Sequence, residues 1–113
     1  MKIVKKLERR LFKHGESCVI YEYPTNDRTI DGCIAKISGR YPEKGGAVNK
    51  ISKELAYVIN GAGTVTIENK TTDIGEGDMV LIQPNEKFYW EGEMELFIPC
   101  TPAWNPEQYE IIV

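Results

Sequence analysis

Hydrophobic and polar residues alternate in short runs along most of the chain. Seven runs of five or six residues are rich in β-branched and aromatic side chains, and several alternate with period two, as β-strands do. We expect strands at Cys18–Tyr23, Gly32–Ile37, Leu55–Asn60, Thr64–Asn69, Asp78–Ile82, Lys87–Glu91 and Glu95–Cys100. Turn sequences rich in glycine, proline and asparagine separate these runs, and we expect turns at "NGAG" and "EGE" among them. The pattern predicts an all-β antiparallel sandwich or barrel.

Three segments qualify this pattern. Lys5–Lys13 fits either a short helix or a charged edge strand that resists aggregation. Ser52 is a typical helix-start residue, but the glycines that follow Leu55–Ile59 favour a strand there. At the C-terminus, Ile111–Val113 form an apolar strand whose exposed edge would invite association. We therefore expect a homodimer.

Composition narrows the function classes. The 113 residues suit a single domain over residues 1–113, and the formal net charge of −3 argues against a nucleic-acid partner. No apolar run is long enough to cross a membrane, and the N-terminus lacks a signal-peptide pattern, so a cytoplasmic protein is expected. Cys18, Cys33 and Cys100 form no CxxC pair, and each is interpreted as a buried thiol.

Two stretches carry a family resemblance. "GGAVNKISKELAYVING" supplies two leading glycines, Glu54 and Gly61, and "GDMVLIQPNEKFYWEG" supplies Gly77, an apolar strand and Pro84. Their order and spacing resemble the two motifs of a small single-domain cupin. That resemblance implies an antiparallel jelly-roll β-barrel with a cavity between its sheets. It also implies dimers, because small cupins commonly pack or exchange terminal strands.

The metal-binding histidines of the cupin motifs are missing from this sequence. Their positions fall on Ala47 and Asn49, or on Val48 and Lys50, and on Phe88. His14, the sole histidine, lies far upstream. Glu54 and Asn49 alone would make a weak two-donor site, so we expect neither a metal nor a cofactor. An unconventional metal site that adds Cys100 or a tyrosine to this pair is an alternative.

Strand alternation indicates what replaces the metal. If Phe88 points inward, Trp90 does too, and an inward Glu54 brings Ala56 and Val58 with it. The two rings would form either an aromatic platform or a core plug, with the Trp90 indole donating to Glu54 or Asn49. The predicted pocket residues are Tyr41, Asn49, Glu54, Phe88, Trp90 and Cys100.

These residues favour a metal-free protein that binds a small molecule, with Glu54 and Asn49 as its polar contacts. Two alternatives remain open. The first is a metal-independent isomerase or epimerase in which Glu54, the candidate catalytic residue, works with Tyr41 or Lys50. The second is an assembly scaffold whose cavity is filled by aromatic rings. The lack of a histidine base near the motifs weighs against an enzyme.

Overall fold

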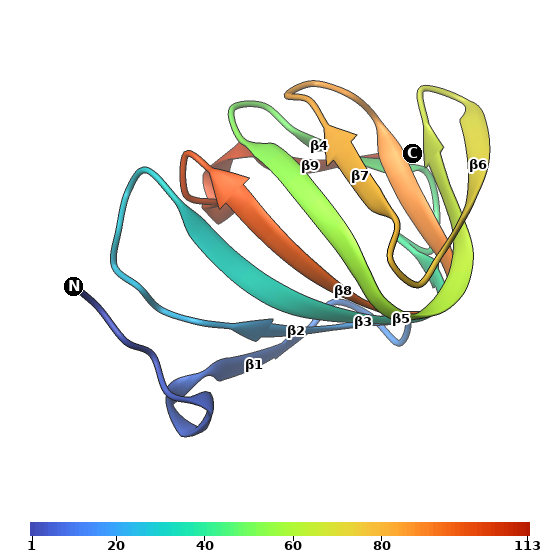
Figure 1. Ribbon diagram of the computed structural model, residues 1–113. Helices are drawn as coiled ribbons and strands as arrows, with labels where there is room; N and C mark the ends of the chain where they lie inside the picture. Colours follow the sequence, from blue (N-terminus) through green and yellow to red (C-terminus); the bar gives the residue numbers. More distant parts are fainter.

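A single curled antiparallel sheet makes up almost the whole computed structural model, which describes residues 1–113 (Figure 1). Its nine strands are β1 (Arg10–Lys13), β2 (Cys18–Glu22), β3 (Asp31–Tyr41), β4 (Gly46–Asn49), β5 (Lys53–Ile67), β6 (Lys70–Gly75), β7 (Met79–Ile82), β8 (Phe88–Thr101) and β9 (Tyr109–Ile112). The only helical segments are two 3-10 turns, η1 (Lys6–Glu8) and η2 (Pro106–Gln108). The expected all-β antiparallel fold is confirmed. No helix is long and apolar enough to span a membrane.

Strand β8 lies at the centre of the sheet and pairs with β3, β4 and β5. From β3 the sheet continues through β2 to the edge strand β1, and from β4 it continues to β9. Strand β5 carries β6 and β7 along its length. The sheet therefore curls around an interior lined by one face of β2, β3, β5 and β8 (Figure 1).

A row of glycines bends the three longest strands at one level. Gly92 of β8 is paired with Gly39 of β3 on one side and with Gly63 of β5 on the other. A Cβ on Gly63 would lie 2.2 Å from the carbonyl oxygen of Glu91, so only glycine allows the strands to approach this closely. The prediction of turns at "NGAG" and "EGE" is therefore wrong, since β5 and β8 each join two predicted strands through a bend.

The ambiguous segments resolve in favour of strands. Lys5–Lys13 forms a 3-10 turn followed by the charged edge strand β1, and no helix extends from Ser52. Instead, the Gln108 side chain holds the loop before β5: its Oε1 accepts from the backbone N–H of Ile51 at 2.9 Å and of Ser52 at 2.7 Å. This contact fixes the C-terminal segment, including β9, against the end of the sheet where the predicted motif residues lie.

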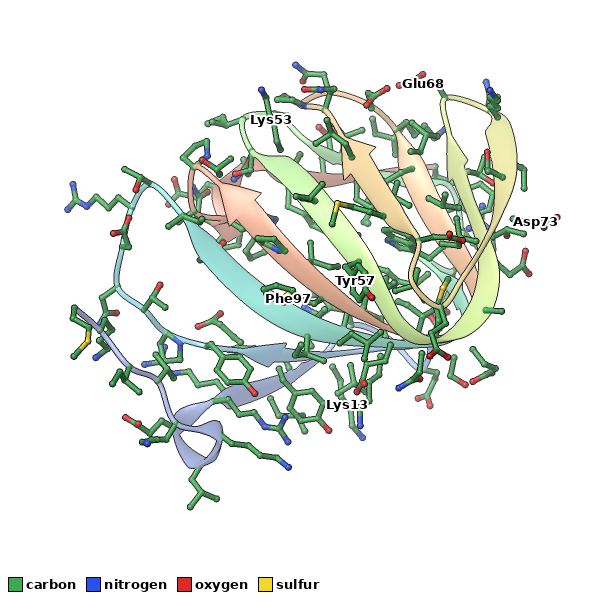
Figure 2. The ribbon with its side chains drawn as sticks, viewed as in Figure 1. Lys13, Lys53, Tyr57, Glu68, Asp73 and Phe97 are labelled. Carbon is green, nitrogen blue, oxygen red and sulfur yellow. The ribbon has the colours of Figure 1, made fainter.

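The outward face of the sheet carries an apolar patch. Its members are exposed large side chains on β5, β7 and β8, namely Leu55, Tyr57, Ile59, Met79, Leu81 and Phe97. Tyr57 is paired with Phe97, and the two lie close together on this face in Figure 2. We call these six residues the outer apolar face. They alternate with buried neighbours such as Ala56 and Val58, which form the core.

Candidate functional site in the barrel cavity

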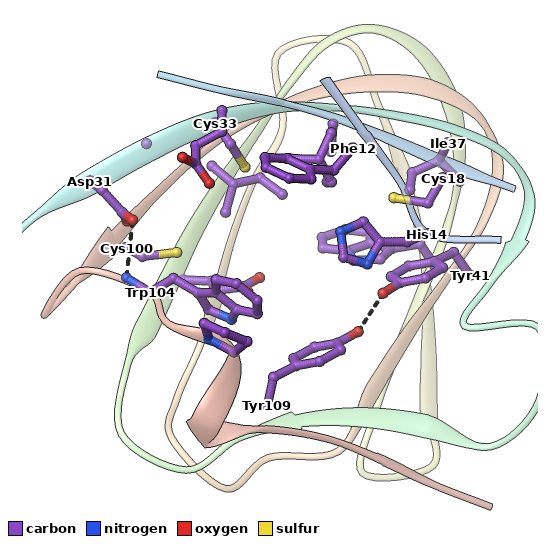
Figure 3. Close-up of a pocket in the computed structure, with 18 of the residues that line it drawn as sticks. Phe12, His14, Cys18, Asp31, Cys33, Ile37, Tyr41, Cys100, Trp104 and Tyr109 are labelled. Carbon is purple, nitrogen blue, oxygen red and sulfur yellow. Dashed lines mark hydrogen bonds between the residues drawn. The ribbon is translucent and has the colours of Figure 1, made fainter. Parts of the chain in front are cut away.

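A cavity of about 360 Å³ lies inside the curled sheet. Nineteen residues line it, thirteen of them hydrophobic, and they come from β2, β3, β5, β8, the β1–β2 hairpin and the C-terminal segment. Figure 3 shows aromatic rings and thiols arranged around this space, with Trp104 and Tyr109 of the C-terminal segment on one side. The fold thus brings together side chains from both ends of the chain.

Strand alternation places three of the expected residues at the cavity. Glu54, Phe88 and Trp90 are buried and line it, whereas Tyr57 points outward, as the period-two pattern predicts. The Phe88 and Trp90 rings meet edge to face, with centroids 6.2 Å apart and planes at 74°. These rings form part of the wall and leave the space open, which contradicts the alternative of a cavity filled by them.

The prediction that Asn49 lines the pocket is wrong, because Asn49 is buried outside the cavity lining and instead supports Glu54. The Asn49 Nδ2 donates to Glu54 Oε1 at 2.8 Å, and the Trp104 Nε1 donates to Asn49 Oδ1 at 2.9 Å. The indole that we expected to pair here was Trp90. Trp104 takes that place because the C-terminal segment folds back over the cavity, a long-range contact that local sequence does not encode.

Glu54 is the most perturbed acid of the site. Its side chain is only 8% exposed, and burial away from water raises its pKa from 4.5 to about 7. The hydrogen bond from Asn49 opposes this shift, and the nearby Asp31 carboxylate adds to it. At neutral pH the protonated and ionised forms are therefore similarly populated, which suits a group that accepts or donates a proton.

The cavity lining is acidic. Asp31 and Glu54 are both paired with Cys100, so the two carboxylates flank the same position of β8. Asp31 accepts from the backbone N–H of Trp104 at 3.1 Å (Figure 3), and burial raises its pKa. Glu22 of β2 is a third carboxylate of the lining, which contains no lysine or arginine.

Comparison with known proteins agrees with this architecture. The family model described as the cupin domain matches residues 48–97, which include Glu54 and Phe88. The solved structure of a Streptomyces PAC13 variant superposes with a TM-score of 0.90 over 98% of this chain and 90% of that one. The chain is a cupin-fold protein.

The structural neighbours of this cupin-fold protein are distant in sequence. The PAC13 variant, solved with uridine, is 18% identical, and Pac13 is described as a nucleoside dehydratase. KdgF from Halomonas sp. superposes with a TM-score of 0.73 at 11% identity, over 95% of this chain and 97% of that one. Ectoine synthase from P. lautus superposes with a TM-score of 0.67 at 18% identity, over 89% of this chain and 80% of that one. No curated protein sequence matches the chain.

The cavity of this cupin-fold protein does not provide the donors of a usual metal centre. Ala47 and Phe88, at two positions of the missing histidines, are paired with each other across β4 and β8 and offer no ligand atoms. No group of three or more His, Cys, Asp or Glu side chains is placed to hold a metal ion. All three cysteines line the cavity, but burial raises their pKa values, to about 12 for Cys18, so they remain neutral thiols. The alternative site of Glu54, Asn49 and Cys100 gains no support.

Several residues of the cavity were missed by sequence reasoning. Tyr41 was expected at the cavity and lines it, but its two partners were not expected. Its hydroxyl hydrogen-bonds that of Tyr109 at 2.6 Å, and His14 packs edge to face on its ring with centroids 6.0 Å apart. The position of His14 far upstream of the motifs was misleading, because the β1–β2 hairpin brings it to the cavity. Its period-two relation to Phe12, which also lines the cavity, is the signal that could have found it.

Proposed function

We propose that this cupin-fold protein binds a small, non-anionic molecule in the barrel cavity without the help of a metal ion. The observation that carries the proposal is the open space of about 360 Å³ beside a nine-tenths buried carboxylate. Small-molecule sites are typically concave and mostly apolar, with a few placed polar groups, and volumes of roughly 300–1,000 Å³ are common. Aromatic side chains supply the apolar walls, and Glu54 supplies the polar contact.

The polar contact is available to a ligand. Glu54 Oε1 accepts from Asn49, and because Glu54 lines the cavity, its second oxygen, Oε2, is the atom open to a ligand. A ligand N–H or O–H directed at Oε2 would satisfy it and hold the ligand in one orientation. The PAC13 variant, which has the same fold, was solved with uridine, and this supports a ligand of about the size of uridine.

Tryptophan fluorescence tests the proposal directly, because the protein has two tryptophans and both line the cavity. A panel of neutral and cationic metabolites, with uridine included, should contain ligands that quench or shift the emission saturably. The matched variant is Ala35→Leu, which fills space at a buried position of the cavity wall. It should abolish the response while circular dichroism shows the fold retained. An unchanged emission spectrum across the whole panel would count against ligand binding.

A second candidate is an enzyme that moves protons without a metal, of the isomerase or epimerase type. The specific observation in its favour is that His14 and Glu54 line the same cavity, which supplies the histidine that the sequence motifs lack. Burial lowers the pKa of His14 and raises that of Glu54, so a neutral imidazole and a protonated carboxyl coexist near neutral pH.

A pH–rate profile distinguishes an enzyme from a binding protein once a ligand is found. Turnover by a Glu54–His14 pair should give a bell-shaped profile whose limbs disappear separately in Glu54→Gln and His14→Gln. A bound ligand recovered chemically unchanged after prolonged incubation would exclude this candidate for that ligand.

We also propose that the protein forms a homodimer through its outer apolar face or through the free edge of β9. Both surfaces expose large apolar side chains, including Phe97 on the first and Ile112 on the second. Sedimentation velocity of Leu81→Lys and Ile112→Lys separates the two surfaces, because only the variant at the true interface should sediment as a monomer. A monomeric wild-type protein at high concentration would contradict the proposal.

A further inference from the structure

The cavity lining carries carboxylates and no lysine or arginine, so its charge favours cationic ligands over neutral or anionic ones. We propose that the natural ligand carries a protonated or quaternary amine, which sits between the aromatic rings and the carboxylates of Glu54 and Asp31. This inference rests on the proposed binding function and adds the chemical class of the ligand. It follows from three features of the cavity: its uncompensated carboxylates, its aromatic walls and the absence of any cationic side chain from its lining.

The carboxylates have little compensation within the protein. Glu54 accepts a hydrogen bond from the neutral Asn49 amide, and Asp31 accepts one from a backbone N–H, so neither is paired with a cation there. Glu22 forms an ion pair of 3.6 Å with Arg10, but both side chains are partly exposed, so this pair weakens rather than cancels the negative field. A buried acidic group gains most from a cation that brings its charge into the same low-dielectric space.

The aromatic walls suit the same ligand. Six rings line the cavity, from Phe12, Tyr41, Phe88, Trp90, Trp104 and Tyr109. The ring pairs meet edge to face, with Trp104 and Tyr109 centroids 5.6 Å apart, so rings in different orientations surround one space. An ammonium group over a ring face gains about 0.5–2 kcal/mol, and cages of this kind recognise quaternary ammonium groups.

The thiols, the phenols and the imidazole around Glu54 are neutral where Glu54 titrates, and Asp31 is the group whose charge changes with it. Cys100 beside it, Cys18 and Cys33 are protonated thiols, and burial raises the pKa of Tyr41 to about 12 and that of Tyr109 further. Burial lowers the pKa of His14, so the imidazole is neutral above its ordinary value of 6.5. Asp31 has a raised pKa and reinforces the negative charge once ionised. The affinity for an amine should therefore rise with pH as Glu54 ionises.

The expected pH dependence is large enough to measure. With a Glu54 pKa of about 7, the ionised fraction rises about tenfold between pH 6 and pH 8. If the cation binds the ionised form, its affinity should rise by about the same factor. Binding should also release a proton, because a bound cation favours the charged carboxylate.

Choline and its uncharged isostere 3,3-dimethylbutan-1-ol are the probes for the test, since they match in shape and differ in charge. We expect titration calorimetry at pH 6, 7 and 8 to show choline binding that strengthens about tenfold with pH. The alcohol should bind at least tenfold more weakly at pH 8. In Glu54→Gln, choline binding should no longer depend on pH, and choline should bind only slightly more tightly than the alcohol. The exposed control Glu107→Gln should behave like the wild type.

Equal affinity for the alcohol and choline, or choline binding that is independent of pH, would overturn the inference. Binding of uridine or of the alcohol without choline would overturn it too, while leaving the proposed binding function intact. If no member of the fluorescence panel binds either, the inference and the proposed function fail together.

Discussion

The burial of Glu54 makes a quantitative prediction about stability. Because the pKa of Glu54 rises from 4.5 in the unfolded chain to about 7 in the folded protein, the folded state keeps a proton that the unfolded state releases between these values. Its contribution to stability is therefore fully present below pH 4.5 and is lost as the pH rises through 7. A shift of this size corresponds to about 3 kcal/mol of unfolding free energy.

The substitution Glu54→Gln isolates this effect. Glutamine has nearly the same shape, and its amide oxygen can accept the hydrogen bond that Asn49 donates, but it does not titrate. All other acids contribute almost equally to both proteins, so the difference between their pH profiles belongs to Glu54. Between pH 4.5 and pH 8, the variant should gain about 3 kcal/mol of stability relative to the wild type.

Urea denaturation at half-unit pH intervals measures this difference. The control is Glu107→Gln, an exposed carboxylate near the C-terminus, whose profile should parallel that of the wild type. Parallel profiles for wild type and Glu54→Gln would refute the reasoning, because they would mean that Glu54 is solvated or paired in the folded protein. A variant that loses stability as the pH rises relative to the wild type would refute it more strongly.

Three further substitutions test the bend, the cavity and its supporting contacts. Gly63→Ala should lower the unfolding free energy measured by urea denaturation by more than about 3 kcal/mol, because the new Cβ would meet a carbonyl oxygen at 2.2 Å. The control Gly75→Ala, whose Cβ would lie 4.0 Å from the nearest atom, should change it by less than about 1 kcal/mol. Tyr109→Phe removes the hydroxyl pair with Tyr41 and should cost about 1 kcal/mol by the same assay; no change would mean that the pair is not formed in solution. Asn49→Ala leaves the Trp104 indole and the Glu54 carboxylate without this partner, so it should lower the unfolding free energy by about 3 kcal/mol. It should also raise the pKa of Glu54, measured by carbon-detected NMR titration, and an unchanged pKa would contradict the contact.

Local sequence was sufficient to predict which side chains face the interior. The period of two in "ELAYV" and "FYW" is a property of extended backbone, so Glu54, Phe88 and Trp90 had to share the buried face once the strands were recognised. Glycines were harder to interpret, because the same residue permits a turn or a close approach of two strands. Gly63 and Gly92 serve the second purpose.

Contacts between distant parts of the chain were not predictable in this way. His14 reaches the cavity only through the pairing of β1 with β2, and Trp104 reaches Asn49 only because the chain turns back after β8. Each contact depends on strand register and loop path, which a single sequence does not specify. The influence of Asp31 on Glu54, and that of Trp104 through Asn49, therefore became visible only in the folded structure.

The two tryptophan indoles provide the most direct test that this cavity is a ligand site. Their Nε1–H resonances in a nitrogen-15 correlation spectrum report on Trp90 and Trp104, which line the same space. On titration with a ligand found by fluorescence, both resonances should shift with one dissociation constant, and the constant should weaken in Glu54→Gln. Shifts confined to amides of the outer apolar face, with both indole resonances unmoved, would contradict the account.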